Sequence, residues 1–359
     1  MHDRATGALS VADLRWRGMR VRMFRCAAAV TALLLAPALA GCGLGAGNSP
    51  QRVALVVTRD FGASTIGDWS APRVSGEDTV MSLLVRNASV GTSDGGGFVQ
   101  SIDGHAAGQQ GSEPVGWFYF VNGVQSAKGA AATDVRSGDR VWWDLHDWSQ
   151  SEESPAVVGS FPAPFTTGLE GKRLAVRVEC ALPSSSACLE VAARLRTLGV
   201  RASVGAIDRG EVPSTLRVLV GAWAAIRDAG HVSTLEEGPR ASGVYARFSA
   251  GGATLDALDD RGRTVAALGA GAGLVAATRH GEDAPVWVVS GTDEAGVHRA
   301  AGAFDVEDLR DRFALTLDPA GAKVAVPAVP AAGSPVAGSR PAESPVAGSH
   351  PAGSRGAGA

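Results

Sequence analysis

A short aromatic segment, residues 138–148, carries two tryptophans and a histidine at alternate positions, where they could bind a ligand. Side chains at alternate positions of a β-strand share one face of the sheet. If Trp143 faces a core, the opposite face carries five side chains, which are those of Arg140, Trp142, Asp144, His146 and Trp148. Large exposed apolar surface usually marks an interface or a ligand platform. We therefore predict a stacking platform for a flat ligand, built from Arg140, Trp142, His146 and Trp148.

Two other interpretations of this face are open. A loop within residues 151–165, or a second domain, could cover Trp142 and Trp148 and leave them with a structural role only. Alternatively, the exposed rings could dock another envelope protein and bind no small molecule. A lone histidine on a polar face is usually solvated, so we expect His146 to be solvated and not to be a ligand of cobalt or of another metal.

The N-terminus has the features of an export signal. A basic stretch, residues 15–25, precedes an apolar run over residues 27–40 that is short for a membrane span. The run ends in Leu39-Ala40-Gly41-Cys42, which resembles the lipobox of bacterial lipoproteins. The resemblance implies a signal peptide over residues 1–42 that is cut before Cys42, whose thiol carries the lipid. Acyl chains would then anchor the protein on the extracytoplasmic face of the cell membrane. The alternative is an ordinary cleaved signal with an incidental cysteine.

The remaining cysteines support an oxidising compartment. Cys26 leaves with the signal, so the mature chain has only Cys180 and Cys188 besides the lipidated residue. Two cysteines at this spacing in an exported protein are expected to form a disulfide. The spacing does not fit a Cys-x-x-Cys redox motif, and no histidine lies near enough in sequence to complete a zinc site.

The sequence after a glycine-rich tether at residues 43–51 predicts a small α+β domain over residues 52–150. A helix begins within residues 77–84, where Asp78 or Thr79 can cap the free backbone N–H groups. It is flanked by predicted strands at residues 53–58 and 98–102, and the two aromatic segments, 116–123 and 138–145, follow. One helix packed on a small mixed sheet is a β-grasp-like arrangement.

The aromatic segments also resemble a known family. Trp117-x-Tyr119-x-Val121-Asn122-Gly123, followed by Gly138-Asp139-x-Val141-x-Trp143, is similar to the transcobalamin-like C-terminal domain. This resemblance implies a small β-domain whose ligand is cobalamin or a related small molecule. In the vitamin B12 carriers a helical barrel forms the other half of the site. Because no such barrel is predicted here, a partner chain, either a membrane transporter or a second cobalamin-binding chain, would supply the other wall.

A linker at residues 151–171 leads to a second domain at residues 172–318, where strands and helices alternate in an α/β pattern of no recognised family. Residues 319–359 are rich in Pro, Ala, Gly and Ser, and such composition predicts a disordered tail. Thus the expected fold class is α+β, with a β-grasp-like domain, an α/β-type domain and a tail.

Two segments of the second domain could carry chemistry. The glycine-rich residues 269–273, before a helix-like stretch at residues 274–279, resemble a dinucleotide loop. However, Leu274 stands where the motif requires glycine, and no acidic residue ends the next strand. Thr292 and Asp293 precede a predicted helix and could receive an anion, but we expect them simply to cap it.

These observations predict a lipid-anchored extracytoplasmic binding protein that hands cobalamin or a similar molecule to a transporter. The net charge of −3 gives no electrostatic case for nucleic acid. Short catalytic motifs are absent from the sequence, so we do not predict an enzyme. The alternatives are an envelope adaptor and an envelope enzyme with its site in the second domain.

Overall fold

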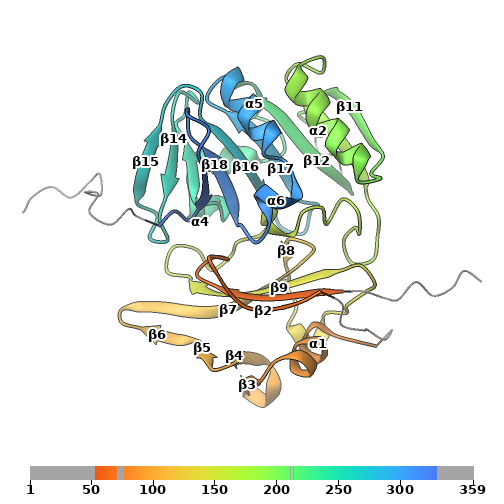
Figure 1. Cartoon of the computed structure of the whole chain (residues 1–359), viewed down its shortest axis with the longest axis vertical. Helices are drawn as coiled ribbons and strands as arrows, with labels where there is room; N and C mark the ends of the chain where they lie inside the picture. The colour runs from red at the N-terminus through yellow and green to blue at the C-terminus, as the bar shows by residue number, and fades with distance from the viewer. Residues whose placement is uncertain (1–52, 71–76, 211, 213, 330–359) are drawn as a thin grey trace, which may run out of the picture. The chain divides into compact units, whose positions relative to one another are not determined.

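The protein is described by a computed structural model over residues 53–70, 77–210, 212 and 214–329 (Figure 1). All of these residues belong to one compact unit. The predicted signal, Cys42 and the tail repeats lie outside the described residues. Within those residues, no helix combines the length and apolar character that crossing a bilayer requires.

The N-terminal domain is built on a mixed sheet in the order β2-β1-β9-β7-β6, with β8 paired to β7. The central pair, β1 and β9, is parallel, and the other neighbours are antiparallel. The strands of this sheet are β1 (Ala54–Arg59), β2 (Ser64–Trp69), β6 (Gly108–Gln110), β7 (Glu113–Val121), β8 (Val124–Gln125) and β9 (Arg140–Asp147).

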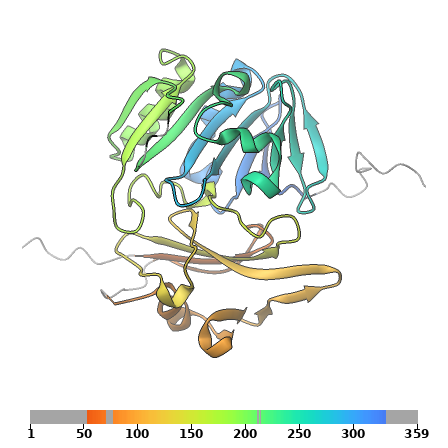
Figure 2. The same cartoon turned by 180° about the vertical axis from the view of Figure 1, so that it is seen from behind.

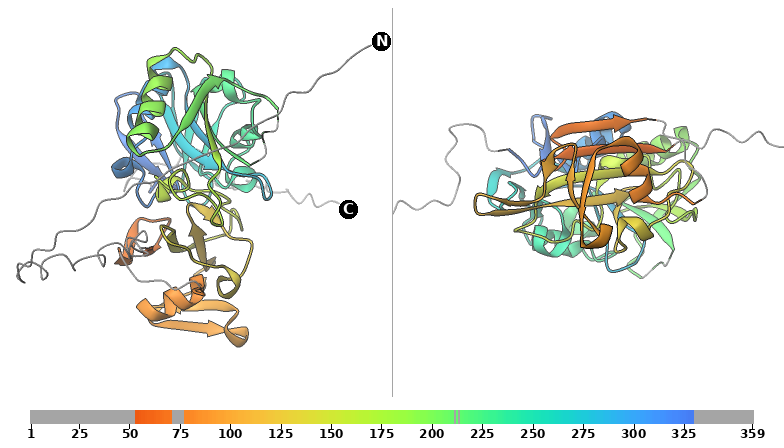
Figure 3. Two further views of the ribbon diagram at one scale, coloured as in Figure 1. Left: turned by 90° about the vertical axis from the view of Figure 1, so that its right-hand side faces the viewer. Right: turned by 90° about the horizontal axis from the view of Figure 1, so that it is seen from below.

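One helix, α1 (Val80–Asn87), covers one face of this sheet. Thr79 caps it through a reciprocal pair of hydrogen bonds with Ser82, which confirms the predicted start. Its apolar residues pack with Val57 and Trp143 in one buried cluster. A small sheet beyond it contains β3 (Val90–Ser93), β4 (Phe98–Ile102) and β5 (His105–Ala106), on the side away from the C-terminal domain (Figure 3).

The C-terminal domain contains a seven-stranded sheet in the order β11-β10-β12-β17-β16-β18-β19. The first four strands of that order are parallel, and the rest are antiparallel. The strands are β10 (Ala175–Cys180), β11 (Ala202–Ala206), β12 (Thr215–Ala222), β16 (Gly273–Thr278), β17 (Val286–Gly291), β18 (Ala314–Leu317) and β19 (Lys323–Val326). The predicted α/β pattern is therefore found in the parallel half only.

Both faces of the seven-stranded sheet are covered. On one face lie α2 (Ser186–Thr197) and α5 (Glu294–Gly302), and α6 (Val306–Leu309) follows them in the chain (Figure 1). A smaller sheet and two short helices pack against the other face (Figure 2). They are β13 (Ala246–Phe248), β14 (Leu255–Leu258), β15 (Thr264–Leu268), α3 (Trp223–Ile226) and α4 (Pro239–Ser242). Strands covered on both faces read as nearly continuous apolar runs, as β12 and β17 do.

The predicted disulfide is confirmed. Cys180 ends β10 and Cys188 lies in the first turn of α2, with 6.0 Å between their Cα atoms. The bond joins the strand to the helix that packs beside it, and both cysteines are buried in the same apolar cluster.

The helix predicted at residues 274–279 is wrong, because these residues form most of β16. Gly273, the last glycine of residues 269–273, allows α5 to approach the sheet. A Cβ atom on Gly273 would lie 2.6 Å from the carbonyl oxygen of Gly296, and one on Gly296 would lie 1.9 Å from that of Ala272. Only glycine fits such a close helix–strand contact.

Two predicted boundaries also need correction. The linker at residues 151–171 is not a solvated connection, because Phe161 and Phe165 are buried against Trp287 and Phe304. The tail begins later than residue 319, since β19 pairs with β18 as the last strand of the sheet. Residues 319–325 stay exposed although the last three of them pair with β18, and Val326 and Ala328 are the buried residues of that segment.

Candidate functional site

The predicted ligand platform is covered. Trp142 has no exposed surface, and only 3% of His146 is exposed. Trp142 packs with Phe120 of its own sheet and with Phe313, which precedes β18 of the C-terminal domain, at 5.5 and 5.3 Å between ring centroids. The second domain therefore covers this face at Trp142 and His146, as one of the alternatives predicted. Neither of these two rings is available to stack on a ligand or a partner protein.

The other two candidates also lie near this seam between the domains. Arg140 forms an ion pair with Asp311, which comes just before Phe313. Trp148 is half-buried, and its ring lies beside Gly116 on β7. The alternation predicted along β9 is correct, because Trp143 packs with α1 while Trp142 lies in the cluster on the other side.

His146 is held between aromatic rings. It stacks on Phe61 and on Phe118, with 4.5 Å between ring centroids in both cases, and meets the edge of Phe313. Its Nδ1 lies 2.8 Å from a carboxylate oxygen of Asp144. Because an ionised carboxylate only accepts hydrogen bonds, this contact places a proton on Nδ1.

Asp144 is fully buried and holds the turn between β1 and β2. Its two oxygens accept hydrogen bonds from the backbone N–H groups of Phe61 and Gly62 at 3.0 and 2.8 Å. They also accept from the hydroxyl of Thr58, which in turn accepts from the indole N–H of Trp142 at 2.7 Å. Four donors therefore satisfy one buried carboxylate, as burial of such a group requires.

The turn that Asp144 holds has an unusual backbone. Asp60, Phe61 and Gly62 all have positive φ angles, 59°, 58° and 83°. Left-handed residues other than glycine carry strain and persist only where the surroundings impose them. A Cβ atom on Gly62 would lie 1.9 Å from the carbonyl oxygen of Asp311, so the turn is pressed against the C-terminal domain.

A cavity of about 1190 Å³ opens beside this turn. Its walls come from both domains and include the β1–β2 turn, the β5–β6 segment, the loop before β18, and β19. The lining contains both apolar and charged side chains, among them Phe61, Val115, Leu145, Asp147, Asp260, Arg310, Arg312, Val324 and Ala328. None of the four predicted ligand-binding residues lines it, although Leu145 and Asp147 on the same strand do.

One part of the cavity wall is acidic. Burial raises the pKa of Asp260, and the nearby charges of Asp259 and Asp147 raise it further. Burial also raises the pKa of the Tyr245 hydroxyl, again with contributions from Asp147 and Asp260. Tyr245 lies 5.0 Å from Phe61 between ring centroids, which connects this acidic wall to the strained turn.

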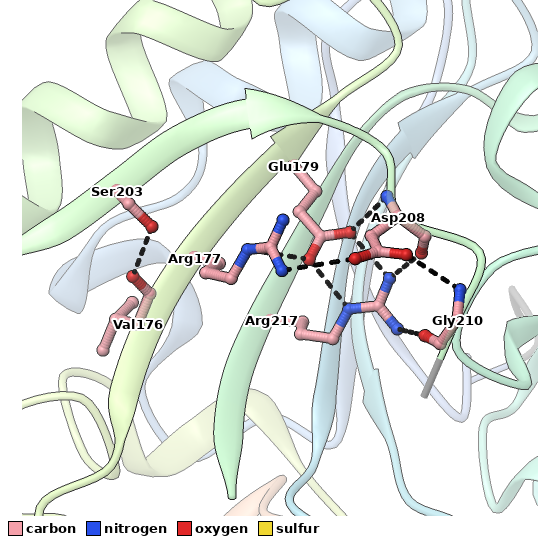
Figure 4. Close-up of polar contacts among 7 residues, drawn as sticks. All are labelled: Val176, Arg177, Glu179, Ser203, Asp208, Gly210 and Arg217. Carbon is pink, nitrogen blue, oxygen red and sulfur yellow. Dashed lines mark hydrogen bonds and ion pairs between the residues drawn. The ribbon is translucent and has the colours of Figure 1, made fainter. Parts of the chain in front are cut away.

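A second, smaller cavity of about 310 Å³ lies in the C-terminal domain, where His231 and His280 stack at 4.6 Å. Its floor includes Arg217, which binds Glu179 through two hydrogen bonds of 3.0 and 2.6 Å (Figure 4). Within the described part of the chain, no group of three or more His, Cys, Asp or Glu residues could hold a metal ion.

The helix N-terminus considered for anion binding is occupied by its own cap. One oxygen of Asp293 accepts from Gly296 N at 2.9 Å, and the other accepts from Gly271 N at 2.8 Å. The hydroxyl of Thr292 donates to the carbonyl oxygen of Gly269. The carboxylate already supplies the negative charge that a helix N-terminus favours, so capping is the role of these residues.

Comparison with protein families gives a match to part of the N-terminal domain. A family model described as "Domain of unknown function (DUF4430)" matches residues 77–147. The match runs from just before α1 to the end of β9, and it is compatible with a bacterial extracytoplasmic domain. A search of curated proteins finds no match to the chain.

Strand β9 was predictable from the sequence, but the residues that cover its Trp142 face, Phe61 and Phe313, were not. Phe61 follows β1 in an Asp-Phe-Gly turn that looked like a simple strand end, and Phe313 lies far along the chain from Trp142. Neither carries a motif. The positive φ angles of the turn and the contact with residues 311–313 become visible only in the folded chain.

Proposed function

We propose that this protein is a lipid-anchored, extracytoplasmic binding protein that captures a small molecule in the 1190 Å³ cavity and passes it to a membrane transporter. The first ligand to test is cobalamin or a related corrinoid. The membrane location rests on the lipobox-like sequence that ends at Cys42, and the ligand class rests on the resemblance of the aromatic strands to the transcobalamin-like domain.

The strand arrangement supports a β-grasp-like domain. The first and last strands of the N-terminal sheet, β1 and β9, lie parallel at its centre, and a single helix crosses one face.

The cavity itself carries the proposal. The sequence alone required a partner chain to supply a second wall, but here the chain's own C-terminal domain lies opposite the N-terminal turn and strand edge. Ligand pockets commonly form at domain boundaries and combine apolar walls with a few polar groups. This lining has both kinds of group, and the strained β1–β2 turn lies in it.

Titration of the chain from residue 43 with cobalamin tests the ligand, since the residues that the structure describes belong to one compact unit. Binding should shift the visible spectrum of cobalamin and quench tryptophan emission. Ala106→Trp places a large ring in the cavity wall and should abolish both changes. Ala131→Trp, on an exposed helical turn outside the cavity, is the matched control. Unchanged spectra at high micromolar cobalamin would rule out capture of the vitamin by this chain.

The anchor needs its own experiment. Cells fed radiolabelled palmitate should label the wild-type protein and retain it in the membrane fraction. Cys42→Ala should remove the label, because acylation requires the thiol. A labelled Cys42→Ala protein would contradict lipidation at this residue and would leave the ligand proposal unaffected.

The small cavity favours one alternative, an envelope enzyme with its site in the C-terminal domain. The stacked His231 and His280 could exchange protons with a substrate, because imidazole nitrogens can both donate and accept protons. Replacing both histidines should then abolish an activity yet leave ligand capture in the larger cavity intact.

A further inference from the structure

Two arginines on the cavity wall have no partner. Arg310 and Arg312 both line the cavity, and neither guanidinium forms an ion pair or a hydrogen bond with any residue that the structure describes. Arg310 is exposed and Arg312 is half-buried. By contrast, Arg59 on the same wall pairs with Asp60 at 3.2 Å. Guanidinium groups are the side chains best suited to bind carboxylate or phosphate through paired hydrogen bonds.

The backbone between these arginines is held in place. Asp311 has a left-handed φ angle of 55°, a conformation that aspartate adopts more readily than most residues other than glycine. Its carboxylate pairs with Arg140, and its N–H donates to the carbonyl oxygen of Gly159 at 3.2 Å. The close approach of Gly62 to its carbonyl oxygen adds a third restraint. The loop is therefore a rigid support, and the two arginines extend from a fixed base.

Most acidic groups in the lining are already engaged. Asp60 pairs with Arg59, Glu113 with Arg261, and Asp311 with Arg140. Asp147 accepts from the backbone and hydroxyl of Ser149 at 2.8 and 3.0 Å. Asp260 accepts a hydrogen bond from the backbone of Arg261. Glu307 is the acidic lining residue without such a contact inside the described ranges. The two arginines without a partner flank Asp311 on one loop.

We propose that the ligand of this cavity carries an anionic group, such as a carboxylate, sulfonate or phosphate, that Arg310 and Arg312 bind. The rest of the ligand contacts the apolar lining around Phe61, Leu145 and Ala328. This inference rests on the proposed function, because it specifies the charge of a ligand in the same cavity.

Two fluorescent probes with similar apolar bodies test it. Toluidinyl-naphthalene sulfonate is anionic, and N-phenyl-naphthylamine is neutral. Wild-type protein should bind both, and Ala106→Trp should weaken both. The double variant Arg310→Ala/Arg312→Ala should weaken the sulfonate probe about tenfold or more, the change expected when a charge-assisted contact is lost. It should leave the affinity for the neutral probe within about twofold.

Arg196→Ala/Arg240→Ala is the matched control, since both arginines are exposed and lie outside the cavity. Thermal melting checks that each variant folds. Arg310→Ala alone serves if the double variant does not fold, because Arg310 is exposed; a weaker sulfonate affinity in it supports the inference. Equal sulfonate affinity in wild type and variant overturns the anion inference alone. Failure of both probes to bind wild type overturns the cavity proposal with it.

Discussion

Two buried carboxylates, one in each domain, are stabilised in different ways. Asp144 and Glu179 both have no exposed surface. Glu179 receives two hydrogen bonds from the guanidinium of Arg217, and the backbone N–H of Asp208 adds a third at 3.0 Å (Figure 4). Asp144 has no arginine or lysine partner among the described residues, and its four donors are a hydroxyl, two backbone amides and an imidazole.

The difference matters because of what each network holds. The Glu179 network ties β10 and β12 to the loop after β11, so it stabilises the C-terminal domain. The Asp144 network imposes a strained turn that lines the large cavity and touches the C-terminal domain. We therefore expect damage to the first network to reduce stability without affecting binding, whereas damage to the second should reduce both.

The largest expected effect is that of Arg217→Ala. It removes both guanidinium hydrogen bonds from the buried Glu179 carboxylate and leaves only the partly exposed Arg177, at 3.5 Å, as a cation. We expect the free energy of unfolding to fall by about 3–5 kcal/mol. Urea denaturation followed by tryptophan fluorescence measures the loss. The double variant Glu179→Leu/Arg217→Met removes both charges and should recover most of it. An equal loss in the exposed control Arg209→Ala would show that the buried pair has no special role.

Asp144→Asn should cost less but also impair binding. An amide has two donor hydrogens and cannot accept from all four donors, so we expect a loss of about 2–3 kcal/mol in the free energy of unfolding. Because the β1–β2 turn would lose its restraint, binding of the neutral probe N-phenyl-naphthylamine should weaken as well. Arg217→Ala, measured where it is still folded, should bind this probe normally. Equal losses of probe affinity in Asp144→Asn and Arg217→Ala would contradict the difference proposed between the two networks.

His146→Phe tests one donor of the same network. The phenyl ring keeps the stacking between Phe61 and Phe118 but removes the hydrogen bond from Nδ1 to Asp144. We expect a loss of about 1 kcal/mol in the free energy of unfolding, again by urea denaturation. A loss as large as that of Asp144→Asn would mean that the imidazole, and not the backbone donors, holds the carboxylate.

The smallest expected effect concerns a third carboxylate, Asp260, which is half-buried near other acidic groups. Its raised pKa means that ionisation opposes folding, so the cost develops as the pH rises above the unfolded value near 4. Asp260→Asn should therefore raise the melting temperature at pH 7 by about a degree. The gain should disappear below about pH 4, where Asp260 is protonated in both states. A gain that persists there would have another cause.

Local features of the fold were predictable from the sequence. Thr79 caps α1, and Asn122 and Gly123 turn the chain with φ angles of 53° and 81°. The Cys180–Cys188 pair forms the expected disulfide. The alternation of Trp142 and Trp143 correctly separates the two faces of β9. Each of these depends on residues close together in the chain, where spacing and side-chain chemistry leave few choices.

Features that depend on distant contacts were not predictable. The glycines at residues 269–273 resembled a nucleotide loop, but one of them, Gly273, serves the approach of α5 to β16. The strand β2 was missed because its alternating residues are mostly polar or small. Whether Trp142 faces solvent depends on Phe313, and no local pattern in either segment indicates that they meet.

The sequence by itself therefore determined the capped helix, the disulfide and the alternation along β9. Only the tertiary structure decided that the tryptophan face is a seam between domains and that the cavity opens beside it, with Arg310 and Arg312 in its wall. Alternation specifies which side chains share a face, because it follows from backbone geometry. What covers that face is set by the packing of residues that are far apart in the chain.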